Sequence, residues 1–410
     1  MSEGDASRRP LIVQKFGGTS VATPDSRALV CDRVRARVEG GADVIVVVSA
    51  MGRAGEPYAT DSLLGLLAGL APDPREADLL SSCGEVISAV VLAHELRAAG
   101  LAAHAMTGRG AGVLTDGEFG DAAVLAVDPM PLTDALARGL VPVVTGFQGI
   151  SPAGETTTLG RGGSDTTACA IGAALGAAAV EIHTDVDGVM SADPRTCDGV
   201  RVLDSLQYEE LFQMARAGAK VMHAPAAEIA MSAGVPVRVL NTDGSSRGTL
   251  VAGAETFAGV TRRVATAVSR AEGVTRFVVS LPEPPERGAA VTAIFRRMAD
   301  EGVSLDMFTP VDGRLAFSVE SASADEAAAL LGPLHLRSTR QDGLAKVTLV
   351  GAGMHGVPGV MARIAEALSA VGIEILQSAD SHYTISVLVR DAQATTAVDA
   401  LHEAFGLGVE

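Results

Sequence analysis

A lysine and two glycines come together directly after the first apolar segment of the chain, in Lys15-Phe-Gly-Gly-Thr-Ser20. Adjacent glycines let a backbone turn tightly and approach a phosphate, and a neighbouring lysine supplies a positive charge. The order differs from a Walker A loop, in which the lysine follows the glycines. The motif is either a phosphate-binding loop or a purely structural turn between a strand and a helix.

Three more glycines surround an arginine further along the chain, where Gly160, Arg161, Gly162 and Gly163 precede a predicted helix. Backbone N–H groups in such a turn, together with those of the helix N-terminus, favour a bound anion. For Asp165, the alternative to a role in anion binding is that of a simple helix N-cap. An arginine held among three glycines is a costly arrangement for a loop without a ligand, and this favours an anion-binding nest.

A third polar cluster spans residues 184–195, at the end of a predicted strand, where open α/β sheets bind ligands. Its acidic residues do not have the spacing of an EF-hand, because Gly188 comes too early and no glutamate closes the loop. A nucleotide contact is the better interpretation, with Arg195 and Lys220 as candidate cations for phosphate.

Glu85 follows a glycine in Ser81-Ser-Cys-Gly-Glu85. It is either a solvated charge beside a turn or a group that recognises a substrate ammonium, and the sequence leaves both open. The histidines lack zinc-binding spacing, and no Ser–His–Asp order suggests a hydrolase triad.

The overall charge restricts the class of partner. Lys and Arg total 32 against 49 Asp and Glu, a formal net charge of −17, which argues against binding to nucleic acid or an anionic membrane. Four widely spaced cysteines suit a reduced compartment. The polar N-terminus offers no signal peptide, so we expect a cytoplasmic protein.

The elements that must position these residues alternate between strand and helix. Continuous β-branched runs are typical of strands buried on both faces, and apolar residues at helical spacing separate them. Predicted strands cover 11–14, 43–48, 140–145, 179–184 and 235–240, and predicted helices cover 26–38, 78–98, 164–178 and 208–217. This order predicts one large α/β domain up to about residue 250.

Beyond a turn-rich boundary near 242–261, the chain contains an internal repeat of about 70 residues. Residues 275–280 are similar to 346–351, and 315–319 to 384–388. Each copy has the predicted order strand, helix, strand, strand, helix, which suggests two ferredoxin-like units. Neither copy contains a catalytic cluster, so the repeats are either packing domains or a ligand sensor.

Taken together, the motifs resemble those of the aspartate kinases, within the amino-acid kinase family, over nearly the whole chain from Leu11. The segments that carry this resemblance are KFGGTSV at 15–21, VVSAMG at 47–52, SCGE at 82–85, TGFQG at 145–149, GRGGSDTTA at 160–168, TDVDGVMSADPR at 184–195 and GAKVMH at 218–223. The C-terminal repeats resemble that family's tandem ACT domains, and no homoserine dehydrogenase segment follows, as in a monofunctional form.

The resemblance implies a three-layer amino-acid kinase sandwich followed by ferredoxin-like ACT domains of the α+β class. The expected parts are a disordered extension at 1–10, the kinase domain at 11–250, a linker at 251–272, and ACT domains at 273–340 and 341–410. The C-terminal tail is a candidate to complete the first ACT domain.

The family also implies MgATP-dependent phosphorylation of the β-carboxylate of L-aspartate, at the start of lysine, threonine, methionine and diaminopimelate synthesis. Lys15 and Asp165 are the implied catalytic residues, with Asp165 orienting Lys15. Implied nucleotide contacts are Lys15, Phe16, Gly17, Gly18, Thr184, Asp185, Met190, Asp193, Arg195 and Lys220. Implied aspartate contacts are Ser49, Glu85, Arg161, Gly162, Gly163 and Ser164. Mg²⁺ would be held mostly by phosphate oxygens and water.

Paired ACT domains imply an end-product amino acid as effector and a homodimer or higher homo-oligomer. Lysine, threonine and meso-diaminopimelate are the candidate effectors. Implied effector contacts are Met354, Val357, Pro358, Gln377, Ser378 and Ser381. Arg109, Phe119 and Ala123 depart from the family pattern, and the first repeat lacks its usual Pro-Gly loop. A different amino-acid kinase, or a sensor with a degenerate kinase half, are the rival hypotheses.

Overall fold

The computed structural model describes residues 9–219, 222–257, 263–354 and 356–408. These fall into two compact units. The first contains residues up to Val189, Val202–Ala215 and the chain from Lys220 to Val260; the second contains Met190–Arg201, Arg216–Ala219 and the chain from Thr261 onward. Lys220 and most of the predicted N-terminal extension lie outside the described residues.

An eight-stranded, mainly parallel sheet forms the centre of the first unit, in the order β10-β12-β11-β9-β1-β2-β6-β3. Its strands are β1 (Leu11–Phe16), β2 (Asp43–Val48), β3 (Ala103–Met106), β6 (Val141–Thr145), β9 (Ala179–Thr184), β10 (Ser205–Gln207), β11 (Val237–Asn241) and β12 (Thr249–Ala252). The five predicted strands are confirmed, each within about two residues at its ends. Strands β3, β10 and β12 were not predicted, because runs of three or four residues give too weak a periodic signal.

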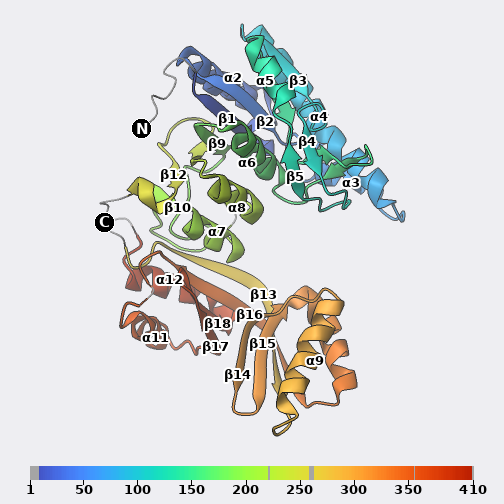
Figure 1. The fold of residues 1–410 in the computed structure, drawn as a ribbon. Helices are drawn as coiled ribbons and strands as arrows, with labels where there is room; N and C mark the ends of the chain where they lie inside the picture. Colours follow the sequence, from blue (N-terminus) through green and yellow to red (C-terminus); the bar gives the residue numbers. More distant parts are fainter. Residues whose placement is uncertain (1–8, 220–221, 258–262, 355, 409–410) are drawn as a thin grey trace, which may run out of the picture. The chain divides into compact units, whose positions relative to one another are not determined.

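Helices cover both faces of this sheet, which confirms the predicted three-layer sandwich (Figure 1). On one face, α2 (Pro24–Glu39) and α4 (Pro74–Ala98) bury Val34 and Leu92 against Phe16 and Val46. On the other face lies α6 (Gly163–Leu175), and α8 (Ala224–Ala233) packs on α6. The remaining helices of this unit are α1 (Gly18–Val21), α3 (Thr60–Gly65), α5 (Met130–Ala137), α7 (Tyr208–Arg216) and the short η1 (Ala254–Phe257).

A second, small sheet in this unit has the order β5-β4-β7-β8. Its strands are β4 (Val113–Thr115), β5 (Val124–Val127), β7 (Gln148–Ile150) and β8 (Thr156–Thr158). None of them was predicted. The sheet leads the chain from the end of β8 into the glycine-rich turn before α6.

Within the described residues, α4 is the one helix with the length and apolar composition to cross a membrane. Half of its most apolar window is buried inside the protein. Leu92 and Leu96 are fully buried in the core, and two carboxylates, Asp78 and Glu85, are buried on the same helix. These features are those of a core helix in a folded domain.

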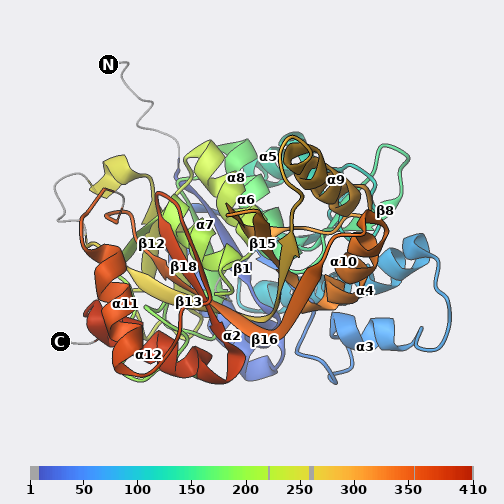
Figure 2. The same ribbon diagram turned by 90° about the horizontal axis from the view of Figure 1, so that it is seen from below.

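Both repeats of the second unit share one six-stranded sheet, in the order β14-β15-β13-β16-β18-β17. Its strands are β13 (Ala267–Ser280), β14 (Asp306–Val311), β15 (Arg314–Glu320), β16 (Ser338–Val350), β17 (Gln377–Asp380) and β18 (Thr384–Arg390). The helices are α9 (Arg287–Asp300), α10 (Ala324–Leu331), α11 (Val360–Ala370) and α12 (Ala394–Ala404), with short turns at η2 (Ser321–Ser323), η3 (Gly332–Leu334) and η4 (Asp391–Gln393). Figure 2 shows α11 beside α12 at one end of this sheet and α9 with α10 at the other.

The predicted domain boundaries need correction. The predicted linker 251–272 overlaps β12 at one end and β13 at the other, and the boundary between 340 and 341 falls inside β16. Strands β13 and β16 pair antiparallel along most of their length, so the strands of the two repeats form one continuous sheet. Their sequence similarity located the repeated unit but carried no information about this shared pairing.

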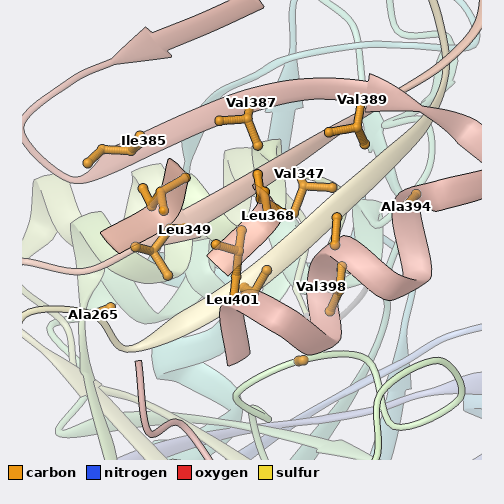
Figure 3. Close-up of a cluster of buried hydrophobic side chains, with 14 of the residues drawn as sticks. Ala265, Val347, Leu349, Leu368, Ile385, Val387, Val389, Ala394, Val398 and Leu401 are labelled. Atoms are coloured by element: carbon orange, nitrogen blue, oxygen red, sulfur yellow. The ribbon is translucent and has the colours of Figure 1, made fainter. Parts of the chain in front are cut away.

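One buried cluster contains residues of the second repeat and of the chain just before and at the start of β13 (Figure 3). Val347, Leu368 and Leu401 pack together there, and Ala265 joins them from the chain before β13. The C-terminal tail is a predicted candidate to complete the first repeat. This prediction is wrong, because α12 packs in the core of the second repeat. The first repeat has its own core around Phe277 and Phe317.

The segment Met190–Arg201 also belongs to the second unit. Its Ala192 and Cys197 are part of the buried cluster that contains Leu401. Ser191 Oγ lies 2.9 Å from His402 Nε2, and the Val268 N–H donates to the Ser191 carbonyl at 2.8 Å. Part of the chain that follows β9 is therefore built into the core of the second unit.

Candidate active site

The predicted polar clusters follow neighbouring parallel strands. Strand β1 pairs in parallel with β2 and with β9, and β2 pairs in parallel with β6. Their carboxyl ends therefore meet at one edge of the sheet, where Gly17, Ser49, Gly146 and Asp185 follow the four strands. This edge is where open α/β sheets bind their ligands.

Lys15 and the turn before α6 converge at this edge, as the sequence predicts. Lys15 Nζ lies 2.6 Å from Asp165 Oδ1, and the two side chains are only 12% and 11% exposed. Lys15 points to the face of the sheet opposite to Phe16, toward α6, and Asp165 is in the first turn of that helix. The pair places a cation and its counter-ion at the helix N-terminus, where backbone N–H groups are unpaired.

Gly18 has a steric reason to be glycine. A Cβ atom at this position would lie 2.6 Å from the Gly52 carbonyl oxygen and 2.8 Å from that of Ala50. The Gly52 N–H donates to the Gly18 carbonyl at 3.0 Å, which ties the loop after β1 to the loop after β2. The close approach of these two backbones holds the two loops together at the edge of the sheet.

The glycine-rich turn presents its arginine to solvent. Gly162 has a φ of 72° in the left-handed region, and a Cβ there would lie 2.3 Å from His223 Cβ. Gly163 and Ser164 are buried, whereas Arg161 is exposed and makes no ion pair within the described part of the chain. Ser164 Oγ accepts a hydrogen bond from Ser49 Oγ at 3.1 Å. The turn thus joins the end of β2 while its guanidinium is available for a ligand.

Glu85 is buried at the same edge, with 2% of the residue exposed. One carboxylate oxygen accepts from the Ala50 N–H at 2.9 Å, and among the described residues the other oxygen has no hydrogen-bond partner. Burial raises the pKa of Glu85 to about 8, although the Ala50 N–H opposes this shift. Of the two interpretations of Glu85, the solvated charge is excluded, and a buried carboxylate with an unpaired oxygen favours a cationic ligand group.

This pKa predicts a measurable dependence of stability on pH. The Glu85 pKa rises on folding, so the folded protein holds a proton that the unfolded chain releases above about pH 4.5, and stability falls as pH rises toward 8. In the Glu85→Gln variant, the free energy of unfolding should not show this decrease, which amounts to at most about 5 kcal/mol in the wild type. Thermal unfolding of both proteins between pH 5.5 and pH 8.5 checks it. Parallel pH curves for the two proteins would contradict the assignment.

The predicted nucleotide residues are divided between the two units. Thr184 and Asp185 lie at this edge of the first unit, and the Thr184 hydroxyl donates to Asp185 Oδ1 at 3.2 Å. Asp193 and Arg195 belong to the second unit and pair with each other, which holds the pKa of Asp193 below its usual range. Met190 also belongs to the second unit, and Lys220 lies outside the described residues.

The prediction for Phe16 needs correction. Its side chain is fully buried in the core and stacks on the His183 ring, with the ring centroids 4.6 Å apart. A nucleotide contact through the Phe16 side chain is excluded by this burial. The residue supports the loop instead, since the His183 carbonyl accepts from the Gly17 N–H at 3.3 Å.

Sequence reasoning also missed residues at this edge. Arg53 forms an ion pair with Asp185, and Phe147 has a φ of 68°, which is unusual for a residue with a side chain. Phe147 lies against Gly163, at the start of α6. Phe147 lies within the TGFQG segment but has no chemical group that marks it as a site residue, and Arg53 is a lone arginine without a spacing signal.

The departures from the family pattern lie on loops beside the small sheet. Phe119 is partly exposed, and the Ala123 N–H donates to Asp116 Oδ1 at 3.2 Å. Arg109 is exposed in the loop before β4. None of the three contacts the Lys15–Asp165 pair.

The predicted effector residues divide into buried and exposed groups. Met354 is buried in the second-repeat core. The Gln377 side chain is also buried, and its amide donates to Thr309 Oγ1 at 3.2 Å and to the Met307 carbonyl. The exposed members are Val357, Pro358, Ser378 and Ser381.

The residues at the edge suit a nucleotide phosphate better than a metal held by the protein alone. The described residues contain no group of three or more His, Cys, Asp or Glu with the geometry to hold a metal ion. The lysine, the close-packed glycines and the N-terminus of α6 together supply a positive field for anions. A divalent cation fits here as a partner of phosphate oxygens.

Comparison with known proteins gives a consistent result. Residues 10–241 match the amino acid kinase family, and residues 339–403 match an ACT domain. Aspartokinase 1 of Bacillus subtilis is 45% identical over 402 residues, covering 97% of this chain and 99% of the relative. Aspartokinase of Mycobacterium tuberculosis is 41% identical, covering 97% of this chain and 96% of the relative.

Solved structures agree. The structure of E. coli aspartokinase III in complex with aspartate and ADP, in the R-state, has a TM-score of 0.82 and 27% identity, covering 97% of this chain and 100% of that one. The T-state of the same enzyme, in complex with lysine and aspartate, has a TM-score of 0.72 and 26% identity, covering 96% and 99%.

Proposed function

This chain belongs to the aspartokinases of the amino acid kinase family, and we propose from that premise which of its residues perform the reaction. It is an ATP-dependent phosphotransferase that converts L-aspartate to 4-phospho-L-aspartate. The observation that supports the assignment of its site is the Lys15–Asp165 pair at the carboxyl ends of the parallel strands.

The substrate carboxylate needs no general base, because it is already ionised near neutral pH. The protein has to align two anions and stabilise charge on the group being transferred. We assign that stabilisation to Lys15 Nζ, which Asp165 holds in place at 2.6 Å. A Cβ atom on Gly17 would lie 3.8 Å from Lys15 Nζ, so the backbone of this loop runs beside the ammonium, and we place the phosphate oxygens there.

Aspartate is held, in this proposal, by groups on three elements. Arg161 suits a bidentate grip on the α-carboxylate. Glu85 has an unpaired buried oxygen for the ammonium, and a bound ammonium would restore the charge that burial suppresses. Ser49, which precedes the Ala50 that binds Glu85, donates to Ser164 at 3.1 Å, and Ser164 follows Gly162 and Gly163 in the turn that carries Arg161.

ATP supplies the γ-phosphoryl group, and Mg²⁺ neutralises its phosphate oxygens when bound. We place the nucleotide at Gly17, Gly18, Thr184 and Asp185. The Arg53–Asp185 ion pair at this position is exposed, so it can rearrange for a ligand at little cost.

The direct test is the reaction itself. Purified protein with MgATP and aspartate should form an acyl phosphate, which hydroxylamine traps as a hydroxamate. Glutamate serves as the matched control substrate, since it is one methylene longer. Hydroxamate from glutamate and not from aspartate would overturn the substrate assignment, and ligand binding without turnover would favour the sensor hypothesis.

We further propose that the enzyme is a cytoplasmic homodimer or higher homo-oligomer, acts in lysine, threonine, methionine and diaminopimelate synthesis, and is regulated by an end product. E. coli aspartokinase III has a solved complex with lysine, and the ACT match at 339–403 supports an amino-acid effector here. Lysine, threonine or meso-diaminopimelate should lower the rate several-fold, corresponding to a coupling of about 1–3 kcal/mol. Titration of each into the assay, with the melting temperature followed in parallel, checks this. No change in either quantity would contradict it.

A further inference from the structure

A buried carboxylate on α4 lies outside every motif discussed so far. Asp78 is 3% exposed, and it makes no ion pair with any described residue. Its two oxygens accept three hydrogen bonds: Oδ2 from the Thr158 N–H at 2.8 Å and the Gly120 N–H at 3.0 Å, and Oδ1 from the Thr158 hydroxyl at 2.8 Å. A buried carboxylate is stable in such a place only with several donors of this kind.

The donors come from two separate segments, the end of β8 and the loop between β4 and β5. Thr158 is the last residue of β8, three positions before Arg161. Gly120 is in the loop between β4 and β5, and the Ala122 N–H of that loop donates to the Thr158 carbonyl at 2.9 Å. A Cβ on Gly160 would lie 2.5 Å from Asp121 Oδ1, so this loop packs directly against the glycine-rich turn.

Asp78 and Glu85 are seven residues apart on α4, which is about two helical turns, so they lie on the same side of the helix. Glu85 contacts the end of β2 through the Ala50 N–H, and Asp78 contacts the end of β8. One rigid helix therefore fixes two parts of the site at a constant spacing.

The turn at 160–163 contains three glycines, and glycine backbones lose the most conformational freedom on ordering. Because Asp78 binds Thr158 at the start of this turn, the turn can adopt fewer conformations, and the Arg161 side chain is held in fewer positions. We propose that Asp78 is a positioning residue, which holds the 158–163 turn and the 116–122 loop together as one wall of the amino-acid site and thereby sets the affinity for aspartate. This inference rests on the proposed function, in which Arg161 binds the substrate carboxylate.

The test compares three variants on α4. Asp78→Ala removes all three hydrogen bonds, whereas Asp78→Asn keeps an oxygen for the two N–H groups and turns an NH₂ toward the Thr158 hydroxyl, which can accept. Ser81→Ala is the matched control, because the buried Ser81 hydroxyl donates only to the Asp78 carbonyl of its own helix, at 3.2 Å. We expect Asp78→Ala to raise KM for aspartate at least tenfold and leave KM for ATP within twofold. Asp78→Asn should change KM for aspartate less than threefold, and Ser81→Ala should change neither.

Thr158→Val serves if Asp78→Ala does not fold, since it removes one hydrogen bond only, and a rise of about threefold in KM for aspartate alone is expected. Equal rises in both KM values, no rise in either, or an Asp78→Asn variant as impaired as Asp78→Ala would each overturn the proposal. Amide hydrogen exchange separates this result from the proposed function. If the wild type does not phosphorylate aspartate, the proposed function fails. Faster amide exchange over 116–122 and 158–163 in the Asp78 variants, and not in Ser81→Ala, would still support the role of Asp78 in holding these two segments. Unchanged exchange in the Asp78 variants would overturn that role.

Discussion

Replacing Lys15 with methionine is expected to lower kcat by about a thousandfold or more, the scale of loss when a preorganised charge is removed from an acyl- or phosphoryl-transfer site. Methionine keeps most of the side-chain volume and removes the charge. Because Lys15 lies in a nearly buried pair, its ammonium acts in a medium where charge interactions are stronger than in water. The measurement is steady-state hydroxamate formation at saturating aspartate and MgATP.

A second variant separates chemistry from folding. Lys15→Met leaves the Asp165 carboxylate, 11% exposed, without its partner, and this should destabilise the protein. The double variant Lys15→Met/Asp165→Asn should recover the melting temperature and remain inactive. A Lys15→Met protein that keeps more than a tenth of the wild-type kcat would refute the role given to Lys15.

Replacing Arg161 with alanine is expected to raise KM for aspartate about a hundredfold. Two charge-assisted hydrogen bonds to one carboxylate are lost, which we estimate at about 3 kcal/mol in this exposed position. Arg161→Lys should recover part of this loss, since a lysine supplies the charge without the planar fork. KM for ATP should stay within twofold, because the guanidinium is assigned to the amino acid.

The control for this prediction is Arg138→Ala. Arg138 is also exposed, directly after α5, and its replacement removes the same charge from the first unit. Its kinetic constants should equal those of the wild type. A larger effect of Arg161→Ala on KM for ATP than on KM for aspartate would move this residue to the nucleotide side of the site.

The sequence predicts the phosphate-binding edge well because its residues occur in clusters. Lys15 is close to Gly17 and Gly18, and Asp165 follows Gly162 and Gly163, so each half of the site is visible as a local motif. Strand runs such as 43–48 are continuous and β-branched, which identifies them and places both halves at the same edge of the sheet. The 2.6 Å contact between Lys15 and Asp165 follows from that placement.

Other features depend on contacts that have no local pattern. Asp78 is one acidic residue in a helix, and only the fold brings Thr158 and Gly120 to it. The KFGGTSV motif predicts a nucleotide contact for Phe16. Because neighbouring residues of a strand point to opposite faces, the Phe16 side chain instead points away from Lys15 and into the core. The shared sheet of the two repeats has no local signal either, because β13 begins inside the predicted linker and its partner β16 is distant in the sequence.

The membership of Met190–Arg201 in the second unit has a practical consequence for dissecting this enzyme. A fragment cut after β12 would retain this segment but lose the strands and helix that bury Ala192 and Cys197, as well as the His402 partner of Ser191. Such a fragment would display uncovered apolar side chains and a tendency to aggregate. For chimeras between relatives, the segment to exchange therefore comprises residues 190–201 and 216–219 together with the chain from residue 261 onward, and a single crossover point cannot transfer all of it.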